Sequence, residues 1–241
     1  MPAIARPIIF LVRFQEVHVQ QTCEGGKDRE AAITEPHDDR KSVTIFRIEV
    51  LLKKTSPKIW RCIEVSSKTS LDQFHRILQI VMGWKNCHLH EFHFGGRRYG
   101  VPHPQFDLSG RVLSEDSVLL SDALPQPGFK IDYLYDLRCQ WIHGLSLMER
   151  VEPGPKSIYP RLLEGKNSCP PEDCGGPAGY SELKRILKQP SDHIDDLSNA
   201  VRNWAHETGF DPSIFLLDNA IVELRNETNR TLVGAAHSVP Q

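Results

Sequence analysis

Two cysteines and three histidines of this sequence have the side-chain chemistry of metal ligands. Cys169 and Cys174 flank four residues, a separation that zinc sites tolerate. His88 and His90 lie two residues apart, and His143 belongs to a different β-rich segment. Thiolates and imidazoles together form a ligand set that suits zinc. The sequence therefore indicates zinc as a candidate cofactor, with Cys169, Cys174, His90 and His143 as its candidate ligands.

The same residues also have an ordinary structural interpretation. Free cysteines pack as small hydrophobic side chains, and a histidine on a strand can hydrogen-bond a loop carbonyl. A single Cys-x4-Cys pair lacks the second pair that usually accompanies it in zinc motifs. Both interpretations stay open on the sequence alone, so zinc is one option for an otherwise unknown cofactor.

A wider set of polar and aromatic residues could line a binding site. Glu172 and Asp173 lie between the two cysteines, where they could bind a ligand or cap backbone amides of a turn. A nucleophile made of Cys174 and His143 is a further option, and no catalytic residue is identified. The candidate ligand-binding residues are His88, His90, Trp141, His143, Glu172 and Asp173.

Three hairpins and one amphipathic helix must position these residues. The hairpins are predicted within residues 43–65, 88–100 and 129–148, where alternating apolar and polar residues flank turn-forming residues. The helix is predicted to begin at Ser70, which has capping-box spacing to Gln73, and to end at Gly83. The fold class is therefore α+β, with a largely antiparallel sheet built from hairpins and helices packed on it.

The C-terminal third is predicted to be helical. One helix stops before Pro190, a second ends at Gly209, and a third opens at Asp211 and Pro212, because proline is favoured at the first helical position.

The domain organisation follows from changes in composition. Residues 1–42 are predicted to form a flexible N-terminal extension, since much of this segment is polar and has no hydrophobic period. Residues 43–226 carry the predicted α+β domain. The polar residues 227–241 are predicted to form a frayed tail.

The segment from Cys169 to Gly179 is predicted to be a shaped loop. Two prolines fix φ, and consecutive glycines permit positive φ. We expect this loop to close over the sheet face or edge that carries His90, Trp141 and His143, forming a concave site. In the alternative interpretation the loop only plugs the sheet edge and covers unpaired strand groups.

Composition and charge favour some classes of partner and disfavour others. The chain has 241 residues, a net charge of −2 and only small basic clusters, so direct DNA binding is not supported by charge. No apolar run approaches the ~18 residues of a membrane helix, so no membrane partner is expected. Six cysteines are too sparse for a disulfide scaffold, which predicts reduced thiols and a cytoplasmic location.

Several blocks of residues, read in order, resemble one known family. They are Trp60-Arg61, Leu71 to His75, Met82-Gly83-Trp84, His88 to Phe92, Tyr133 to Asp136, Trp141-Ile142-His143, Tyr159-Pro160 and Cys169 to Tyr180. The chain resembles the plasmid pRi Orf-three-like family, also called the insertion-element passenger TnpR family, from about Val43 to Asn226. The resemblance implies an α+β domain associated with mobile elements and implies no activity.

One turn departs from the pattern of that family. The family usually reads Tyr-Asp-Phe-Gly-Asp before Trp-x-His, whereas this chain has Leu137, Arg138 and Cys139 there. An acidic group is therefore missing from the turn.

Two classes of function remain. No complete catalytic constellation is present, which favours a soluble binding or interaction module for a protein or small-molecule ligand. The alternative is a zinc-dependent or Cys/His-based enzyme, with its site between the Cys169–Gly179 loop and the histidine-bearing strands. Whether the protein is an enzyme is left open by the sequence.

Overall fold

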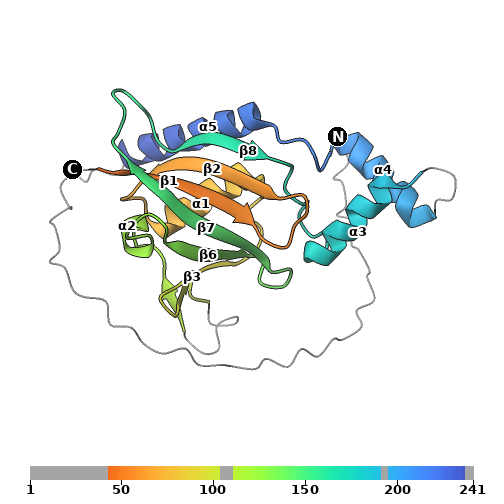
Figure 1. Cartoon of the computed structure of the whole chain (residues 1–241), viewed down its shortest axis with the longest axis horizontal. Coiled ribbons are helices and arrows are strands. Elements are labelled where there is room, and N and C mark those ends of the chain that lie inside the picture. Colours follow the sequence, from red (N-terminus) through yellow and green to blue (C-terminus); the bar gives the residue numbers. More distant parts are fainter. Residues whose placement is uncertain (1–42, 104–110, 191–194, 237–241) are drawn as a thin grey trace. The chain divides into compact units, whose positions relative to one another are not determined.

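One mixed sheet forms the centre of the described chain. The computed structural model describes residues 43–103, 111–190 and 195–236, and the predicted extension 1–42 lies outside them. The strands are β1 (Ile45–Leu52), β2 (Ile59–Ser66), β3 (His90–Phe94), β4 (Arg97–Gly100), β5 (Val112–Ser114), β6 (Lys130–Tyr135), β7 (Trp141–Val151) and β8 (Arg161–Lys166). They pair in the order β5-β4-β3-β6-β7-β1-β2-β8 (Figure 1).

The pairing is antiparallel between all neighbours except β4 and β5, which run parallel. The three predicted hairpins are β1–β2, β3–β4 and β6–β7. The predicted α+β class with a largely antiparallel sheet is therefore confirmed. The sequence did not reveal β5 and β8, which are short strands at the two edges of the sheet.

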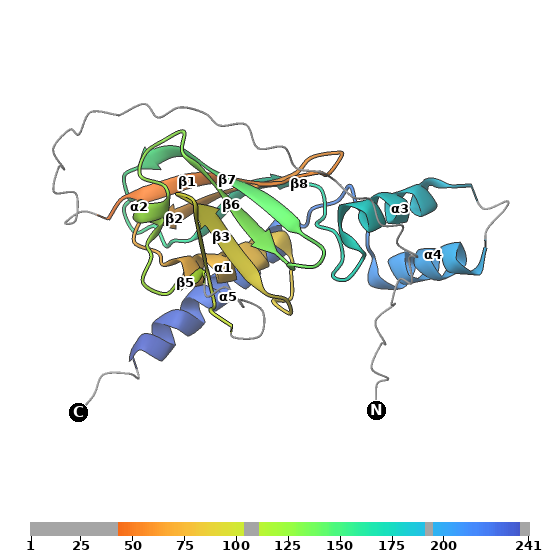
Figure 2. The same ribbon diagram turned by 90° about the horizontal axis from the view of Figure 1, so that it is seen from below.

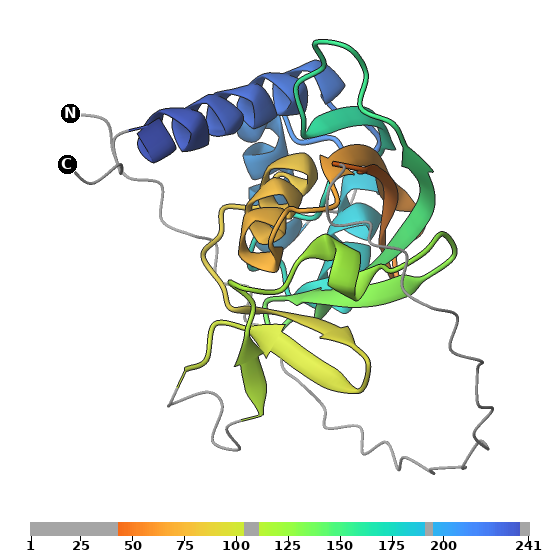
Figure 3. The ribbon, with the colours of Figure 1, turned by 90° about the vertical axis from the view of Figure 1, so that its left-hand side faces the viewer.

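The described chain contains the helices α1 (Leu71–Met82), α2 (Leu120–Ala123), α3 (Gly176–Lys188), α4 (Asp196–Thr208) and α5 (Leu217–Ala236). Two of them, α1 and α5, cover one face of the sheet (Figure 2), and the sheet curves around α1 (Figure 3). α5 packs against α1 and β8, while α3 and α4 pack against each other.

Alternation along the strands explains the core. In β1, Ile48 and Val50 are fully buried, whereas Arg47 and Glu49, which alternate with them, are partly exposed. Successive strand residues point to opposite faces, so one face of β1 is apolar and meets the helices. α1 supplies Phe74, Leu78 and Val81 to this core, and all three are fully buried. The helical spacing of these residues accounts for the predicted apolar face of α1.

The ends of α1 show one prediction confirmed and one wrong. Gly83 adopts a left-handed conformation with φ of 83° and its N–H contacts the carbonyls of Gln79 and Ile80, as a C-terminal glycine does. Ser70 precedes the helix without a side-chain cap hydrogen bond. Its hydroxyl donates instead to the Asp72 carboxylate, because an ionised acceptor forms the stronger hydrogen bond.

The C-terminal third departs from the prediction in three places. It begins with strand β8, so it is not wholly helical. The third helix begins at Leu217 and not at Asp211, because Asp211 Oδ1 accepts hydrogen bonds from the N–H and hydroxyl of Ser213 and closes a turn. α5 then continues through residues 227–236, within the segment predicted to fray. Leu224 is 2% exposed, and its burial ties this helix to the core.

A buried arginine joins the sheet, α1 and the chain after β8. Arg61 on β2 is 0% exposed. Its Nε donates to the carbonyl of Val81 in the last turn of α1 at 2.7 Å, and its Nη atoms donate to the carbonyls of Lys166 and Asn167 at 3.0 Å. The guanidinium also lies 3.5 Å from the ring centre of Phe215. Burial lowers the pKa of Arg61 to about 10.

None of the helices in the described part of the chain combines the length and the apolar character that a membrane span requires.

Replacement of Arg61 tests its structural role. Arg61→Met should lower the free energy of unfolding by about 3 kcal/mol, because several buried carbonyls lose their donor. Arg161→Met is the matched control. Arg161 is half-exposed, and its ion pair with Glu64 is long, at 3.6 Å, so its replacement should lower the free energy of unfolding by less than about 1 kcal/mol. Urea unfolding measures both values, and equal losses would contradict this role.

Candidate functional site

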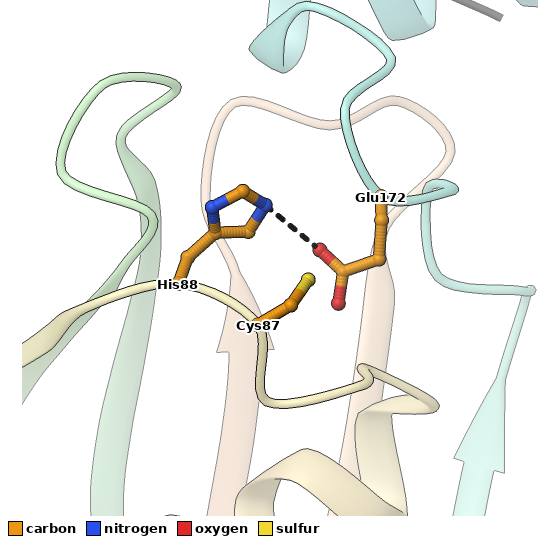
Figure 4. Close-up of side chains that lie close together, drawn as sticks. All are labelled: Cys87, His88 and Glu172. Atoms are coloured by element: carbon orange, nitrogen blue, oxygen red, sulfur yellow. Dashed lines mark ion pairs between the residues drawn. The ribbon is translucent and has the colours of Figure 1, made fainter. Parts of the chain in front are cut away.

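Four side chains from three loops meet at one end of the sheet. His88 precedes β3, Asp136 directly follows β6, and Glu172 and Asp173 lie between β8 and α3. β3 and β6 are antiparallel, with His90 opposite Tyr135, so the start of one strand lies beside the end of the other. We call these four residues the His88 cluster. Figure 4 shows Cys87 and His88 beside Glu172.

The imidazole of His88 faces three carboxylates. Its Nε2 lies 3.3 Å from Asp173 Oδ1, 3.6 Å from Glu172 Oε2 and 3.9 Å from Asp136 Oδ2. These separations are longer than an ordinary N–H···O hydrogen bond. His88 Nε2, Asp136 Oδ2 and Glu172 Oε2 are buried and have no hydrogen-bond partner. Two unpartnered carboxylate oxygens therefore lie within 4 Å of one unpartnered imidazole nitrogen.

The hairpin turn after β6 fixes the Asp136 carboxylate. Asp136 Oδ1 accepts hydrogen bonds from the N–H groups of Arg138 and Cys139, each at 3.1 Å. The side chain of Asp136 is 4% exposed. Leu137, Arg138 and Cys139 are the residues that depart from the family pattern, but their contribution to Asp136 is made by backbone N–H groups. The departure therefore leaves the position of this carboxylate unaffected.

Glu172 is held in the same way through its other oxygen. Glu172 Oε1 accepts hydrogen bonds from the N–H of Lys85 at 2.8 Å and from the hydroxyl of Tyr135 at 3.0 Å. The hydroxyl oxygen of Tyr135 in turn accepts from the N–H of Cys87 at 3.1 Å. Burial and the charge of Glu172 raise the pKa of Tyr135, so this tyrosine stays protonated and donates. One oxygen of Glu172 is fixed, and the other faces His88.

A closed ring of hydrogen bonds fixes the chain segment that carries His88. Gln79 Nε2 donates to the Tyr133 hydroxyl at 2.9 Å, which lies 2.8 Å from His75 Nδ1. His75 Nε2 lies 2.8 Å from Asn86 Oδ1, and the Asn86 N–H donates to Gln79 Oε1 at 2.8 Å. Burial lowers the pKa of His75 to about 3, so its imidazole is neutral. The ring of hydrogen bonds connects α1 and β6 to Asn86, two residues before His88.

The predicted Cys169–Gly179 loop is part loop and part helix, since α3 begins at Gly176. A Cβ on Gly176 would lie 2.8 Å from the carbonyl oxygen of Cys139, and one on Gly179 would lie 1.9 Å from that of Cys174. Gly176 lets the segment approach the β6–β7 turn closely, and Gly179 lets the start of α3 pack against the loop before it. The segment therefore packs against that turn at the end of the sheet.

The structure brings together some of the residues that the sequence singled out. His88, Glu172 and Asp173 lie in the His88 cluster, within the ~10 Å that direct ligation would require. Asp136 was not among the candidates. The sequence did contain a signal for Asp136. An aspartate directly after a predicted strand, at the start of a hairpin turn, is placed to accept hydrogen bonds from backbone N–H groups.

His90, Trp141 and His143 lie outside the His88 cluster and in the core. His90 Nε2 lies 2.9 Å from a carboxylate oxygen of Glu115, and its ring stacks on that of His75 at 3.4 Å. Trp141 is 1% exposed, and its ring centre lies 5.7 Å from that of Trp84. His143 is fully buried, with Nδ1 3.3 Å from the carbonyl oxygen of Tyr133. Strand alternation predicts which face of the sheet each side chain occupies, but it does not predict these partners.

The predicted zinc ligands do not form one group. In the described residues, two groups of potential ligand atoms lie within 4.8 Å of one another: Cys87, His88 and Glu172, and His88, Asp136 and Asp173. Neither contains Cys169, Cys174, His90 or His143. Burial raises the pKa of Cys174 to about 12, and it also raises that of Cys169. These two thiols stay protonated near neutral pH, which disfavours them as nucleophiles.

The family model of plasmid pRiA4b ORF-3-like proteins matches residues 44–219. The chain belongs to this family. It is 34% identical over 148 residues to the uncharacterized protein y4hQ of Sinorhizobium fredii, covering 61% of this chain and 75% of that protein. Its fold is similar to the crystal structure of a protein of unknown function, MM3350, from Methanosarcina mazei Go1, with a TM-score of 0.65 and 27% identity over 74% of this chain and 98% of that one.

The close contact at Gly176 can be tested by one methyl group. Gly176→Ala places a side chain at φ of 70° and against the Cys139 carbonyl, so we expect a loss of more than about 2 kcal/mol of unfolding free energy. Gly95→Ala is the matched control, because Gly95 has φ of 56° and open space around its Cβ position. Chemical denaturation should show the smaller loss for Gly95→Ala; the reverse order would contradict the close contact.

Buried histidines predict how stability depends on pH. Burial lowers the pKa of His143 from 6.5 to about 4, so the unfolded chain takes up a proton in this range and the folded chain does not. The contribution of His143 is fully present above about pH 6.5 and declines as the pH falls toward 4. His75 acts in the same direction.

His143→Asn should make the decline between pH 6.5 and 4 shallower by up to about 1.4 kcal/mol per pH unit. Urea unfolding at a series of pH values measures this slope. His206→Gln, at an exposed position, is the control. An unchanged slope in His143→Asn would show that His143 is not kept neutral by the fold.

Proposed function

We propose that this chain is a binding module for a cationic ligand, which is held by the His88 cluster. The observation that carries the proposal is the Asp136 carboxylate. Its side chain is 4% exposed, and Oδ2 has no hydrogen-bond partner. A buried polar atom without a partner costs about 1–3 kcal/mol, more for a charged group, and in a native protein such an atom calls for a ligand or an ion.

Charge determines the class of ligand. The cluster places three carboxylates around one imidazole. Arg138 pairs with Asp173 at 3.5 Å, but the Arg138 side chain is 81% exposed. An exposed ion pair contributes little, so the excess of negative charge is not offset by the protein itself. A cation would satisfy the unpartnered oxygen of Asp136, and the carboxylate of Glu172 near His88 adds negative charge that favours a cation there.

The cluster is pre-organised and open to solvent. Backbone N–H groups hold one oxygen of Asp136, and Lys85 N–H and the Tyr135 hydroxyl hold one oxygen of Glu172. Fixed donors leave the remaining oxygens aimed at His88, which lowers the entropic cost of binding. The side chain of Asp173 is 43% exposed and that of His88 is 21% exposed, so a ligand can reach them from solvent.

The enzyme alternative is favoured less by these contacts. Burial raises the pKa of Cys87, and it raises that of Cys139 to about 11, so the thiols around the cluster are poor nucleophiles at neutral pH. A binding module is the better interpretation of a cluster with unpartnered oxygens and protonated thiols. The association with mobile elements and the cytoplasmic location stay predictions.

Thermal unfolding with added cations tests the proposal. The ligand panel is Zn²⁺, Mn²⁺, Ca²⁺, spermidine and agmatine, each added to chelator-treated protein. At 100 times its Kd a ligand stabilises by about 2.7 kcal/mol, which corresponds to a rise in Tm of roughly 5–10 °C for a domain of this size. We expect at least one member of the panel to produce such a rise.

Asp136→Asn should abolish the rise while the variant stays folded. Asparagine keeps an oxygen for the N–H groups of Arg138 and Cys139 and tolerates the positive φ of 54° at this position. Without ligand the variant should be at least as stable as the wild type, because a buried charge without a partner is removed. Asp132→Asn is the matched control, since Asp132 lies on β6, four residues before Asp136, but is 42% exposed and paired with Lys53. The proposal is wrong if no cation of the panel binds, or if each binds Asp136→Asn as well.

A further inference from the structure

We propose that the cation is a divalent transition metal, held directly by His88 Nε2, Asp136 Oδ2 and Asp173 Oδ1. This inference rests on the proposed function and narrows it to one class of ligand. It also replaces the zinc site expected from the sequence, since it uses none of the four residues first considered as its ligands.

The distances match the edges of a coordination polyhedron. Metal–ligand bonds of about 2.1 Å place two ligand atoms about 3.4 Å apart in a tetrahedron, and about 3.0 or 4.2 Å apart in an octahedron. His88 Nε2 lies 3.3 Å from Asp173 Oδ1 and 3.9 Å from Asp136 Oδ2, and the three atoms all lie within 4.8 Å of one another. A hydrogen-bonded pair would be closer. The atoms therefore have room for an ion between them.

The donor set selects among divalent cations. One imidazole nitrogen with two carboxylate oxygens suits Zn²⁺, Mn²⁺, Fe²⁺ and Co²⁺, whereas Ca²⁺ and Mg²⁺ take oxygen ligands almost entirely. The Asp136 carboxylate also has the outer support that metal ligands need, because two backbone N–H groups hold its second oxygen. Such supporting hydrogen bonds orient a ligand toward its metal.

Glu172 lies on another side of His88 Nε2. It belongs with Cys87 and His88 to the second group of potential ligands, which includes neither Asp136 nor Asp173. Its Oε2 is 3.6 Å from Nε2 and has no partner. We therefore assign Glu172 to the surroundings of the ion and not to its direct ligands, and expect a smaller effect from its replacement.

Three protein ligands leave at least one coordination position open. Structural zinc sites are closed by four protein ligands, whereas sites that bind exchangeable groups keep a position for water or another ligand. The exposure of Asp173 and His88 places that position toward solvent. We infer that the bound metal ion would itself present a site for a small anionic or neutral donor ligand.

Calorimetric titration of chelator-treated protein with Zn²⁺, Mn²⁺ and Co²⁺ tests the inference. We expect one ion per chain, with His88→Gln, Asp136→Asn and Asp173→Asn each weakening the affinity by about 100-fold or more and Glu172→Gln weakening it about 10-fold. Asp132→Asn and His206→Gln are the controls and should bind as the wild type does. Circular dichroism confirms that each variant is folded.

Spectra of the Co²⁺-loaded protein give a second readout. Visible absorption bands of bound Co²⁺ should appear with the wild type and be lost in His88→Gln. Loss of binding in Cys87→Ser with full binding in Asp136→Asn would move the ion to the second group and overturn the assigned ligands. Binding of spermidine or agmatine that depends on Asp136, without binding of any metal ion, would overturn this inference and leave the proposed function standing. If no cation of either class binds, both are wrong.

Discussion

The buried guanidinium of Arg61 is the contact on which the geometry of this protein depends. It has backbone carbonyls as its hydrogen-bond partners, from β2, the last turn of α1 and the connection after β8. The carbonyl at the end of α1 carries part of the negative helix dipole, so it stabilises the charge that burial opposes. Because Asn167 is held in this way, the segment that carries Glu172 and Asp173 leaves the sheet from a fixed point.

The His88 cluster depends on a second fixed point, on the opposite side of the same sheet end. His75 and Gln79 on α1 hold Asn86 through a closed ring of hydrogen bonds. Closed rings of this kind restrict the orientation of each member, since each makes two hydrogen bonds within the ring. The cluster therefore consists of loop residues, yet two of the three loops that supply it are tied to α1. Loops can position binding residues precisely when a rigid element such as α1 holds them in place.

The sequence predicts most of the sheet and little of the site. Alternation in β1 and the glycine after α1 are local signals, and the structure follows both. Edge strand β8 carries a weaker alternation and was not expected. His90 has a strand position that periodicity can find, but the carboxylate that binds it belongs to Glu115, 25 residues away and outside every predicted hairpin. Partners at long sequence separation are therefore the part that a pattern in one chain does not contain.

The contrast between His90 and His88 also explains why the His88 cluster is a better site than the one first expected. His90 is bonded to a carboxylate at 2.9 Å and is stacked on His75, so its nitrogen is already used. His88 faces more carboxylate oxygens than His90 does, but at distances at which none hydrogen-bonds it. His90 has its hydrogen-bond partner, whereas His88 lies beside fixed carboxylates without one. A cationic donor for these carboxylates is available in the protein, because Arg138 lies 3.5 Å from Asp173, yet its side chain stays exposed. The unsatisfied atoms are better understood as a binding surface whose remaining partner comes from solution.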